Sequence, residues 1–105
     1  MDSGEHFSRG ISLFNAEKFY EAHEEWERIW LKEKGADRLF LQGLIQLAGA
    51  FHHQQRGKMK EAQTALVKAI LKLKNYPPMH WGIDLAGLLA DLSLGSFPKI
   101  RKGFF

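Results

Sequence analysis

The chain of 105 residues contains no cysteine. Disulfide frameworks, thiolate metal sites, iron–sulfur clusters and cysteine nucleophiles are therefore excluded, and stability has to come from packing. No basic segment leads into an apolar run near the N-terminus, so we expect no secretory signal and a cytoplasmic protein. The longest stretch without a formal charge, residues 39–55, is short for a bilayer and contains several glutamines and histidines. It predicts a buried helix and no membrane span.

β-branched residues are also scarce, with a single valine in the whole chain. No stretch shows the sustained alternation that marks a strand, so the sequence predicts an all-α fold. Hydrophobic residues at 45% and charged residues at 26% are ordinary values for a globular protein. A chain of this length can bury one core, and we expect a single helical domain over residues 1–95.

Helical periodicity and capping signals predict five helices. The expected ranges are Ser3–Asn15, Glu17–Glu33, Arg38–Arg56, Lys58–Asn75 and a short segment from Leu85 to Leu92, with Ser3, Asp37 and Asp84 as caps and Gly35, Gly57, Pro77 and Gly95 as stops. Short connections favour an antiparallel helical-hairpin bundle. The small residues Gly10 and Ala22 have counterparts forty residues later in Ala50 and Ala62. This spacing of small residues is weakly tetratricopeptide-like and indicates hairpin geometry more than a repeat protein.

The second expected helix carries polar residues on its apolar side. At 100° per residue, His23 falls in one arc with Phe19, Trp26 and Trp30, and Glu27 continues that arc, so both His23 and Glu27 are expected inside the apolar face. Trp26 and Trp30 are expected to be core aromatics. Because an unpaired buried charge is costly, His23 and Glu27 should have hydrogen-bonding or ionic partners.

The third expected helix offers such partners. Gln42, Gln46, Gly49 and His53 form one polar strip on a helix that is otherwise apolar, and Gly49 would let another backbone approach closely. We therefore expect a buried cluster of His23, Glu27, Gln42, Gln46 and His53 between these two helices. His52, about 100° from His53, is expected at the surface.

Two blocks of residues resemble a known family. The run from His23 to Trp30, HEEWERIW, fits the HExxExxW pattern of the domain-of-unknown-function 309 family, and Leu41–Ala48, LQGLIQLA, with His53 and Gly57, looks like its second block. Lys58 and Glu61 depart from that pattern. The resemblance covers roughly residues 7–75. It implies a helical fold and importance for His23, Glu24, Glu27 and Trp30, and it implies no activity.

The polar cluster has a structural and a functional interpretation. It can be a satisfied core that fixes the pairing of two hairpins, or a ligand or catalytic pocket built from the same groups. As a metal site, His23, Glu27 and His53 would form a two-histidine, one-carboxylate face suited to zinc or non-haem iron. Against it, HExxE lacks the second helical histidine of zinc proteases, and the third helix has no carboxylate for a di-iron site.

The basic residues and the tail bear on partners. The lysines of residues 58–75 are interpreted as the solvated side of an amphipathic helix, and without interleaved arginine and aromatics they argue against nucleic-acid binding. The apolar and basic tail, residues 96–105, should either fold back over the bundle or dock on another subunit. The sequence favours a small binding or interaction domain with a protein partner or a second copy of itself. The alternative is a metal-assisted or acid/base hydrolase using His23, Glu27 and His53.

Overall fold

The computed structural model describes residues 2–94 and 97–103, and it confirms the all-α prediction. Five helices pack against one another: α1 Ser3–Asn15, α2 Phe19–Trp30, α3 Arg38–Gln55, α4 Met59–Leu73 and α5 Leu85–Asp91, the last continued by a 3₁₀ turn, Leu92–Leu94. Within the described residues, none of these helices has both the length and the apolar character that a membrane span requires.

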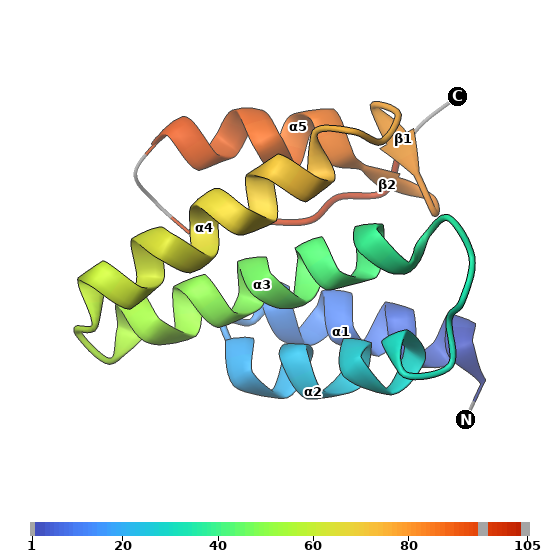
Figure 1. Ribbon diagram of the computed structural model, residues 1–105, viewed down its shortest axis with the longest axis horizontal. Helices are drawn as coiled ribbons and strands as arrows, with labels where there is room; N and C mark the ends of the chain where they lie inside the picture. Colours follow the sequence, from blue (N-terminus) through green and yellow to red (C-terminus); the bar gives the residue numbers. More distant parts are fainter. Residues whose placement is uncertain (1, 95–96, 104–105) are drawn as a thin grey trace.

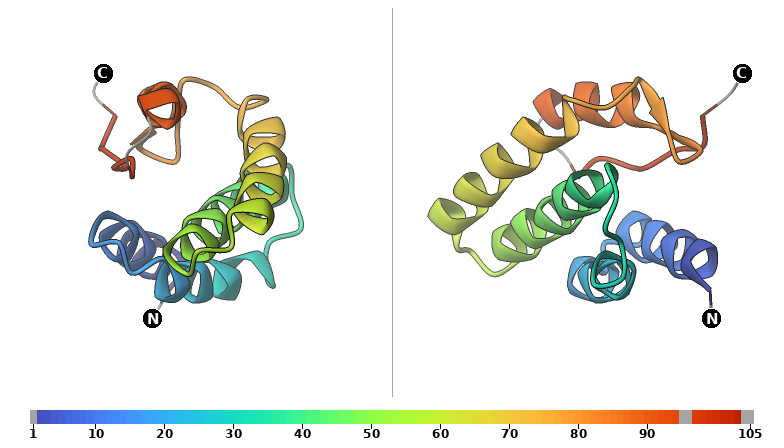
Figure 2. Two further views of the ribbon diagram at one scale, coloured as in Figure 1. Left: turned by 90° about the vertical axis from the view of Figure 1, so that its left-hand side faces the viewer. Right: turned by 45° about the vertical axis from the view of Figure 1, so that its right-hand side comes forward.

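The first four helices form two antiparallel hairpins, α1 with α2 and α3 with α4 (Figure 1). Helices α2, α3 and α4 lie next to one another, and α3 packs against both α2 and α4. Seen from the side, the helices follow an arc with α1 at one end and α5 at the other (Figure 2). The C-terminal segment, residues 97–103, lies between the two ends of this arc.

The core is rich in aromatic side chains, and Trp26 is central to it. Its side chain is fully buried, and its indole Nε1 donates a hydrogen bond to the carbonyl of Phe7, 3.2 Å away. A Cβ atom at Gly10 would overlap the indole ring, so the close approach of α1 to α2 requires glycine there. Other side chains that are buried to the same extent are Phe14, Phe19, Phe40, Leu41, Leu44, Leu47, Leu73, Leu85 and Leu88.

The two hairpins turn in the same way, forty residues apart. Lys18 N donates to Leu13 O (2.8 Å) in the first turn, and Lys58 N donates to His53 O (2.9 Å) in the second. Each turn contains one residue in the left-handed region, Glu17 with φ 62° and Gly57 with φ 75°. The forty-residue offset seen in the sequence therefore corresponds to two turns of one geometry.

A small β-hairpin separates α4 from α5, which corrects the expectation of no strands. Strand β1, Met79–His80, pairs antiparallel with β2, Ile83–Asp84. Both residues of the connecting turn have positive φ, 51° at Trp81 and 75° at Gly82, as in a type I′ turn. Strands of two residues are too short to produce a detectable alternation in sequence.

Of the three predicted caps, Ser3 is wrong, Asp37 holds the N-cap position without a capping hydrogen bond, and Asp84 is confirmed. Asp2, and not Ser3, caps α1, since its side chain accepts a hydrogen bond from Glu5 N at 2.8 Å. Asp37 precedes α3 but makes no capping hydrogen bond. Asp84 does cap α5, accepting from Gly87 N at 2.9 Å. The predicted stop at Gly95 lies outside the described residues.

The C-terminal segment folds back onto the helices over residues 97–103. The side-chain amide of Asn15 donates to the carbonyl of Ile100 and accepts from its N–H, at 2.9 and 2.7 Å. Ile100 is buried, and the ring of Phe97 lies 5.2 Å from that of Phe19. Asp84 N also donates to Arg101 O, which joins this segment to the β-hairpin. Residues 104 and 105 lie outside the described residues.

The two turns give a matched stability test. In the left-handed region an ordinary side chain costs roughly 1 kcal/mol, whereas glycine does not. We expect Glu17→Gly to stabilise the fold by about 0.5–1 kcal/mol and Gly57→Ala to destabilise it by about 1 kcal/mol. Urea unfolding of both variants measures these changes, and a loss of stability in Glu17→Gly would contradict the assignment of strain to the first turn.

Candidate functional site

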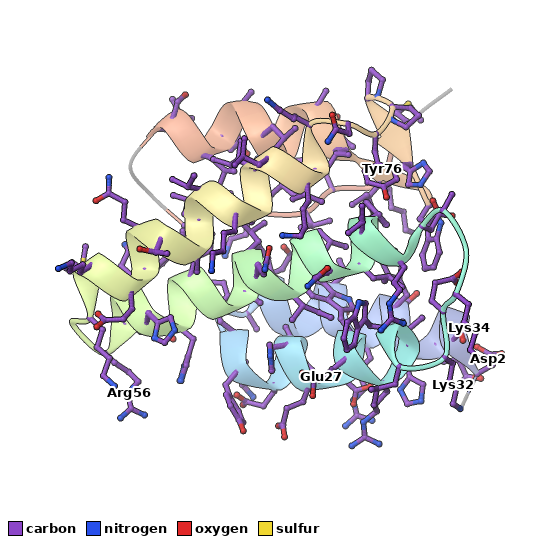
Figure 3. All side chains as sticks on the ribbon, in the orientation of Figure 1. Asp2, Glu27, Lys32, Lys34, Arg56 and Tyr76 are labelled. Carbon is purple, nitrogen blue, oxygen red and sulfur yellow. The ribbon has the colours of Figure 1, made fainter. Side chains whose placement is uncertain are left out.

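The polar strip of α3 forms the floor of a shallow groove between α2 and α4, which we call the motif groove. Gln42, Gln46, Gly49 and His53 lie along this floor in successive turns. A Cβ atom at Gly49 would meet nothing within 4 Å, so the helix is open at that point. The expectation that Gly49 admits another backbone of this chain is therefore wrong. Figure 3 shows α3 between α2, which carries Glu27, and α4.

Two hollows make up the motif groove, and Gln46 borders both. The first, of about 230 Å³, lies toward α2 and is lined by Glu27, Trp30, Gln42, Ile45 and Gln46. The second, of about 450 Å³, lies toward α4 and is lined by Gln46 and His53 with Lys60, Glu61, Thr64, Ala65 and Lys68. The groove therefore runs along α3 from Gln42 to His53.

The expected buried cluster is not present. The side chain of His23 is 29% exposed and that of Glu27 is 47% exposed, and His23 Nε2 lies 3.4 Å from Glu27 Oε2. Among the described residues no charged or polar residue is fully buried, and neither His23 nor Glu27 hydrogen-bonds to Gln42, Gln46 or His53. The reason is that α2 buries a different line of residues, Ala22, Trp26 and Ile29, and leaves His23 and Glu27 at its margin.

Three side-chain nitrogens in the described residues are buried without a hydrogen-bond partner, and all belong to residues singled out from the sequence. They are His23 Nδ1, Trp30 Nε1 and His53 Nδ1. A buried polar atom left unpaired costs about 1–3 kcal/mol. These three nitrogens make no hydrogen bond within the described part of the chain, so each can pair with a ligand without losing one.

The surroundings of Trp30 hold its backbone and leave its indole N–H free. The Arg38 guanidinium lies 3.9 Å from the centre of the indole ring. The same side chain donates to the carbonyls of Trp30 and Glu33, both at 2.7 Å. Trp26 is buried as expected of a core aromatic, whereas Trp30 is only partly buried and packs against the edge of the core.

His52, which was expected at the surface, is partly buried and lies near His23. The ring of Tyr20 lies between the two, 5.9 Å from His23 and 5.3 Å from His52. Burial lowers the pKa of His52, and the nearby positive charge of Arg56 lowers it further, against a smaller opposing effect of Glu21. His53 instead faces α4, where it lines the second hollow.

The structure does not bring together the three proposed metal ligands. His23 and Glu27 form a pair, but His53 lines the second hollow, toward α4. In the part of the chain that the structure describes, no group of three histidine or acidic side chains is arranged to hold a metal ion. Glu24, the remaining acidic residue of the HExxE run, is exposed.

The family model named Domain of unknown function (DUF309) matches residues 7–65. The chain belongs to this family. The DUF309 match extends from α1 to the first half of α4 and so includes the floor of the motif groove and its α2 wall. The β-hairpin, α5 and the C-terminal segment lie outside it. No curated protein matches the chain.

Sequence reasoning missed a second polar centre, formed by Asp37, His80 and Trp81. Asp37 Oδ2 accepts from Trp81 Nε1 at 2.8 Å, and Asp37 Oδ1 lies 2.7 Å from His80 Nε2. The hydrogen bonds from Trp81 and His80 lower the pKa of Asp37. Nothing local to Asp37 in the sequence indicates partners more than forty residues away.

A third polar contact, between α1 and α2, was also missed. Glu25 of α2 was not singled out from the sequence, yet its side chain is only 12% exposed. Its Oε2 lies 2.7 Å from His6 Nδ1, and its Oε1 lies 3.5 Å from Arg9 Nε. Its neighbour Trp26 offered a signal, because a residue beside the centre of a buried face lies at the edge of that face.

The different burial of two tryptophans is testable. We expect Trp26→Ala to destabilise the protein by about 3–5 kcal/mol, because it empties a fully buried site. Trp30→Ala should cost only about 1–2 kcal/mol, because Trp30 is partly exposed and its N–H is unpaired. Urea unfolding with a common slope decides the question. Equal losses at the two positions would place Trp30 in the core.

The Asp37 centre predicts a dependence of stability on pH. Since the folded-state pKa lies below the ordinary value of 3.8, the stabilisation is complete above that value and is lost as the pH falls through the folded-state pKa. At neutral pH, Asp37→Asn should cost about 1–2 kcal/mol. In acid, below about pH 4, its stability should fall less than that of the parent. Trp81→Phe, which keeps the carboxylate and removes one hydrogen bond, should give an intermediate result. Parallel acid profiles for parent and Asp37→Asn would contradict this account.

Proposed function

We propose that this DUF309 protein is a small binding domain that receives a short, extended segment of a protein partner in the motif groove. The observation that carries the proposal is that Trp30 and His53, each with an unpaired buried nitrogen, line the two hollows of this groove, and that His23, which has the third such nitrogen, lies beside Glu27 at its edge. A ligand that hydrogen-bonds to them supplies what the chain itself does not.

The length of the groove fits an extended peptide. Gln42 and His53 are eleven residues apart on α3, which at 1.5 Å per residue is about 16 Å. An extended chain advances about 3.3 Å per residue, so roughly five residues span this distance. The side-chain amide of Gln42 on the floor can both donate to and accept from a peptide backbone.

The α2 wall of the groove carries an acidic side chain and the α4 wall carries basic ones, which select the charges of a bound segment. Glu27 lies on the α2 side of the groove, where it pairs with His23. On the α4 side, Lys68 lines the second hollow, and Lys72 donates to Gln46 Oε1 at 2.9 Å. A partner with a basic residue near Glu27 and an acidic residue near Lys68 complements both walls, and Glu61, which also lines the second hollow, favours a polar or basic neighbour there.

The geometry supports binding more than hydrolysis. The hollow beside Glu27, at about 230 Å³, is smaller than the roughly 300–1,000 Å³ of typical small-molecule sites. His53, the third residue of the hydrolase alternative, lines the other hollow. A peptide that lies across both hollows uses all of these residues, whereas a substrate in one hollow does not.

The three tryptophans provide the test. In a ¹⁵N-labelled protein the indole N–H signals report separately on the core (Trp26), the groove (Trp30) and the Asp37 centre (Trp81). We expect pools from a library of capped hexapeptides to shift the Trp30 indole and the side-chain amides of Gln42 and Gln46. The Trp26 and Trp81 indoles should not move.

Substitutions at Gly49 separate binding from folding. Because Gly49 is helical and its Cβ position is empty, Gly49→Ala and Gly49→Leu should each stabilise the fold, by up to about 1 kcal/mol. The leucine should fill the groove and abolish peptide binding, and the alanine should weaken it only slightly. Binding that survives Gly49→Leu, shifts confined to other indoles, or no shift with any pool at millimolar peptide would each contradict the proposal.

A further inference from the structure

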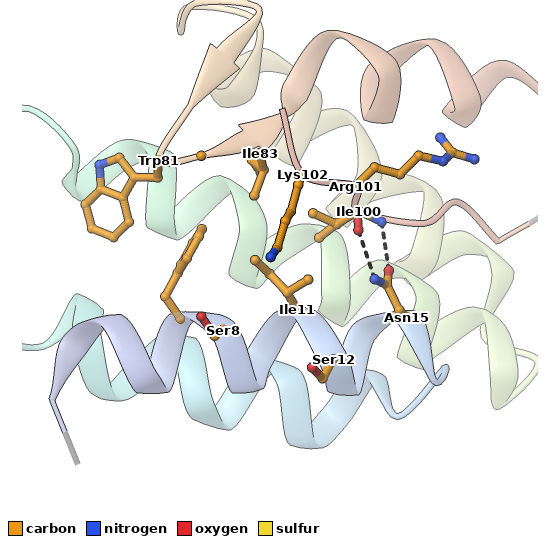
Figure 4. A pocket seen from close by; sticks show the side chains of 11 residues that line it. Ser8, Ile11, Ser12, Asn15, Trp81, Ile83, Ile100, Arg101 and Lys102 are labelled. Carbon is orange, nitrogen blue, oxygen red and sulfur yellow. Dashed lines mark hydrogen bonds between the residues drawn. The ribbon is translucent and has the colours of Figure 1, made fainter. Parts of the chain in front are cut away.

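A separate pocket lies on another part of the molecule, between α1 and the C-terminal segment. It has a volume of about 530 Å³, within the range of small-molecule sites, and α1, the β-hairpin and residues 100–102 line it. Figure 4 shows α1 on one side and the β-hairpin with the C-terminal segment on the other. We call it the α1–tail pocket.

The wall of the α1–tail pocket is largely apolar. Phe7 and Ile11 come from α1, Trp81 and Ile83 from the β-hairpin, and Ile100 from the C-terminal segment. The Phe7 and Trp81 rings pack edge to face, with centroids 5.2 Å apart. An apolar body of a ligand would therefore be held by aromatic and branched aliphatic side chains.

The polar groups of the pocket include uncommitted donors. Ser8 and Ser12 lie one turn apart on α1, and within the described residues the side-chain hydroxyls that donate hydrogen bonds are those of Thr64, Tyr76 and Ser93. Figure 4 shows Lys102 reaching from the C-terminal segment toward α1, near Ile11. The ion pairs made by the described part of the tail involve Lys99 and Arg101, and none involves Lys102.

The lining also determines the sign and the kind of charge. No acidic residue lines the pocket, so nothing in its wall repels an anion. Arg101, the group best suited to a phosphate, points away and pairs with Asp91 at 2.9 Å. A lysine ammonium with nearby hydroxyl donors suits a single carboxylate.

From these observations we infer that the α1–tail pocket binds a small amphipathic carboxylate, with its apolar body against Phe7, Ile83 and Trp81 and its carboxylate at Lys102. The carboxylate accepts from the lysine ammonium and from a serine hydroxyl, while the body displaces water from the apolar wall. This site is independent of the motif groove, because the two share no lining residue.

The test compares acids with alcohols of the same shape. The probes are 3-phenylpropanoate and octanoate, each with its matched alcohol, titrated into the ¹⁵N-labelled protein. The first acid has an aromatic body and the second an aliphatic one, so the pair distinguishes an aromatic acid from a fatty acid as the ligand. We expect at least one acid to bind about tenfold more tightly than its alcohol and to shift the Trp81 indole and the Ser8 and Ser12 amides, but not the Trp30 indole.

Two lysine variants identify the charge. Lys102→Met keeps the apolar stem and should remove the preference for acid over alcohol, whereas Lys74→Met, at the exposed end of α4, should leave it unchanged. Higher salt should weaken binding of the acid more than that of the alcohol. Equal affinities for acid and alcohol in the parent, a preference that survives Lys102→Met, shifts at Trp30 in place of Trp81, or no binding by either acid would overturn the inference.

Discussion

The contact between the Trp26 indole and the bare backbone of Gly10 sets the geometry on which the rest of the molecule depends. Because position 10 has no side chain, α1 lies directly on the indole, and the Nε1 hydrogen bond to Phe7 fixes the register of the two helices. With Trp26 at its centre, the buried face of α2 follows Ala22 and Ile29. His23, Glu27 and Trp30 consequently lie at the margin of this buried face, next to α3 and away from the centre of the core.

The two candidate sites lie on different parts of this framework. The motif groove follows α3 between α2 and α4, and the α1–tail pocket lies across α1, where the C-terminal segment closes the arc of helices (Figures 1 and 2). Asn15 joins the first hairpin turn to that segment through two hydrogen bonds with Ile100. The DUF309 match includes the floor of the groove but ends before the β-hairpin and the tail, so the pocket is completed by residues outside the matched region.

Sequence reasoning predicted the helices well because helical periodicity and glycine or proline stops are local signals. Within the described residues it also identified the three with an unpaired buried nitrogen, because His23 and Trp30 on an apolar arc and His53 on a polar strip are visible in helical projections. It misjudged their burial, because a projection of one helix does not show which part of the arc is the centre when two neighbours share it. Asp37 resembled an N-cap from its position before α3, but its partners His80 and Trp81 follow more than forty residues later, and only the tertiary fold brings them together.

Hydrogen exchange of the three indole N–H groups in the unliganded protein tests most directly whether Trp30 is left unpaired. The indoles of Trp26 and Trp81 donate to Phe7 and Asp37, so exchange there requires a hydrogen bond to break as well as the structure to open. Trp30 needs only a local opening of the motif groove. The account predicts that the Trp30 indole exchanges fastest of the three. Protection of Trp30 equal to that of Trp26 would show that the chain already satisfies this nitrogen and would contradict the account.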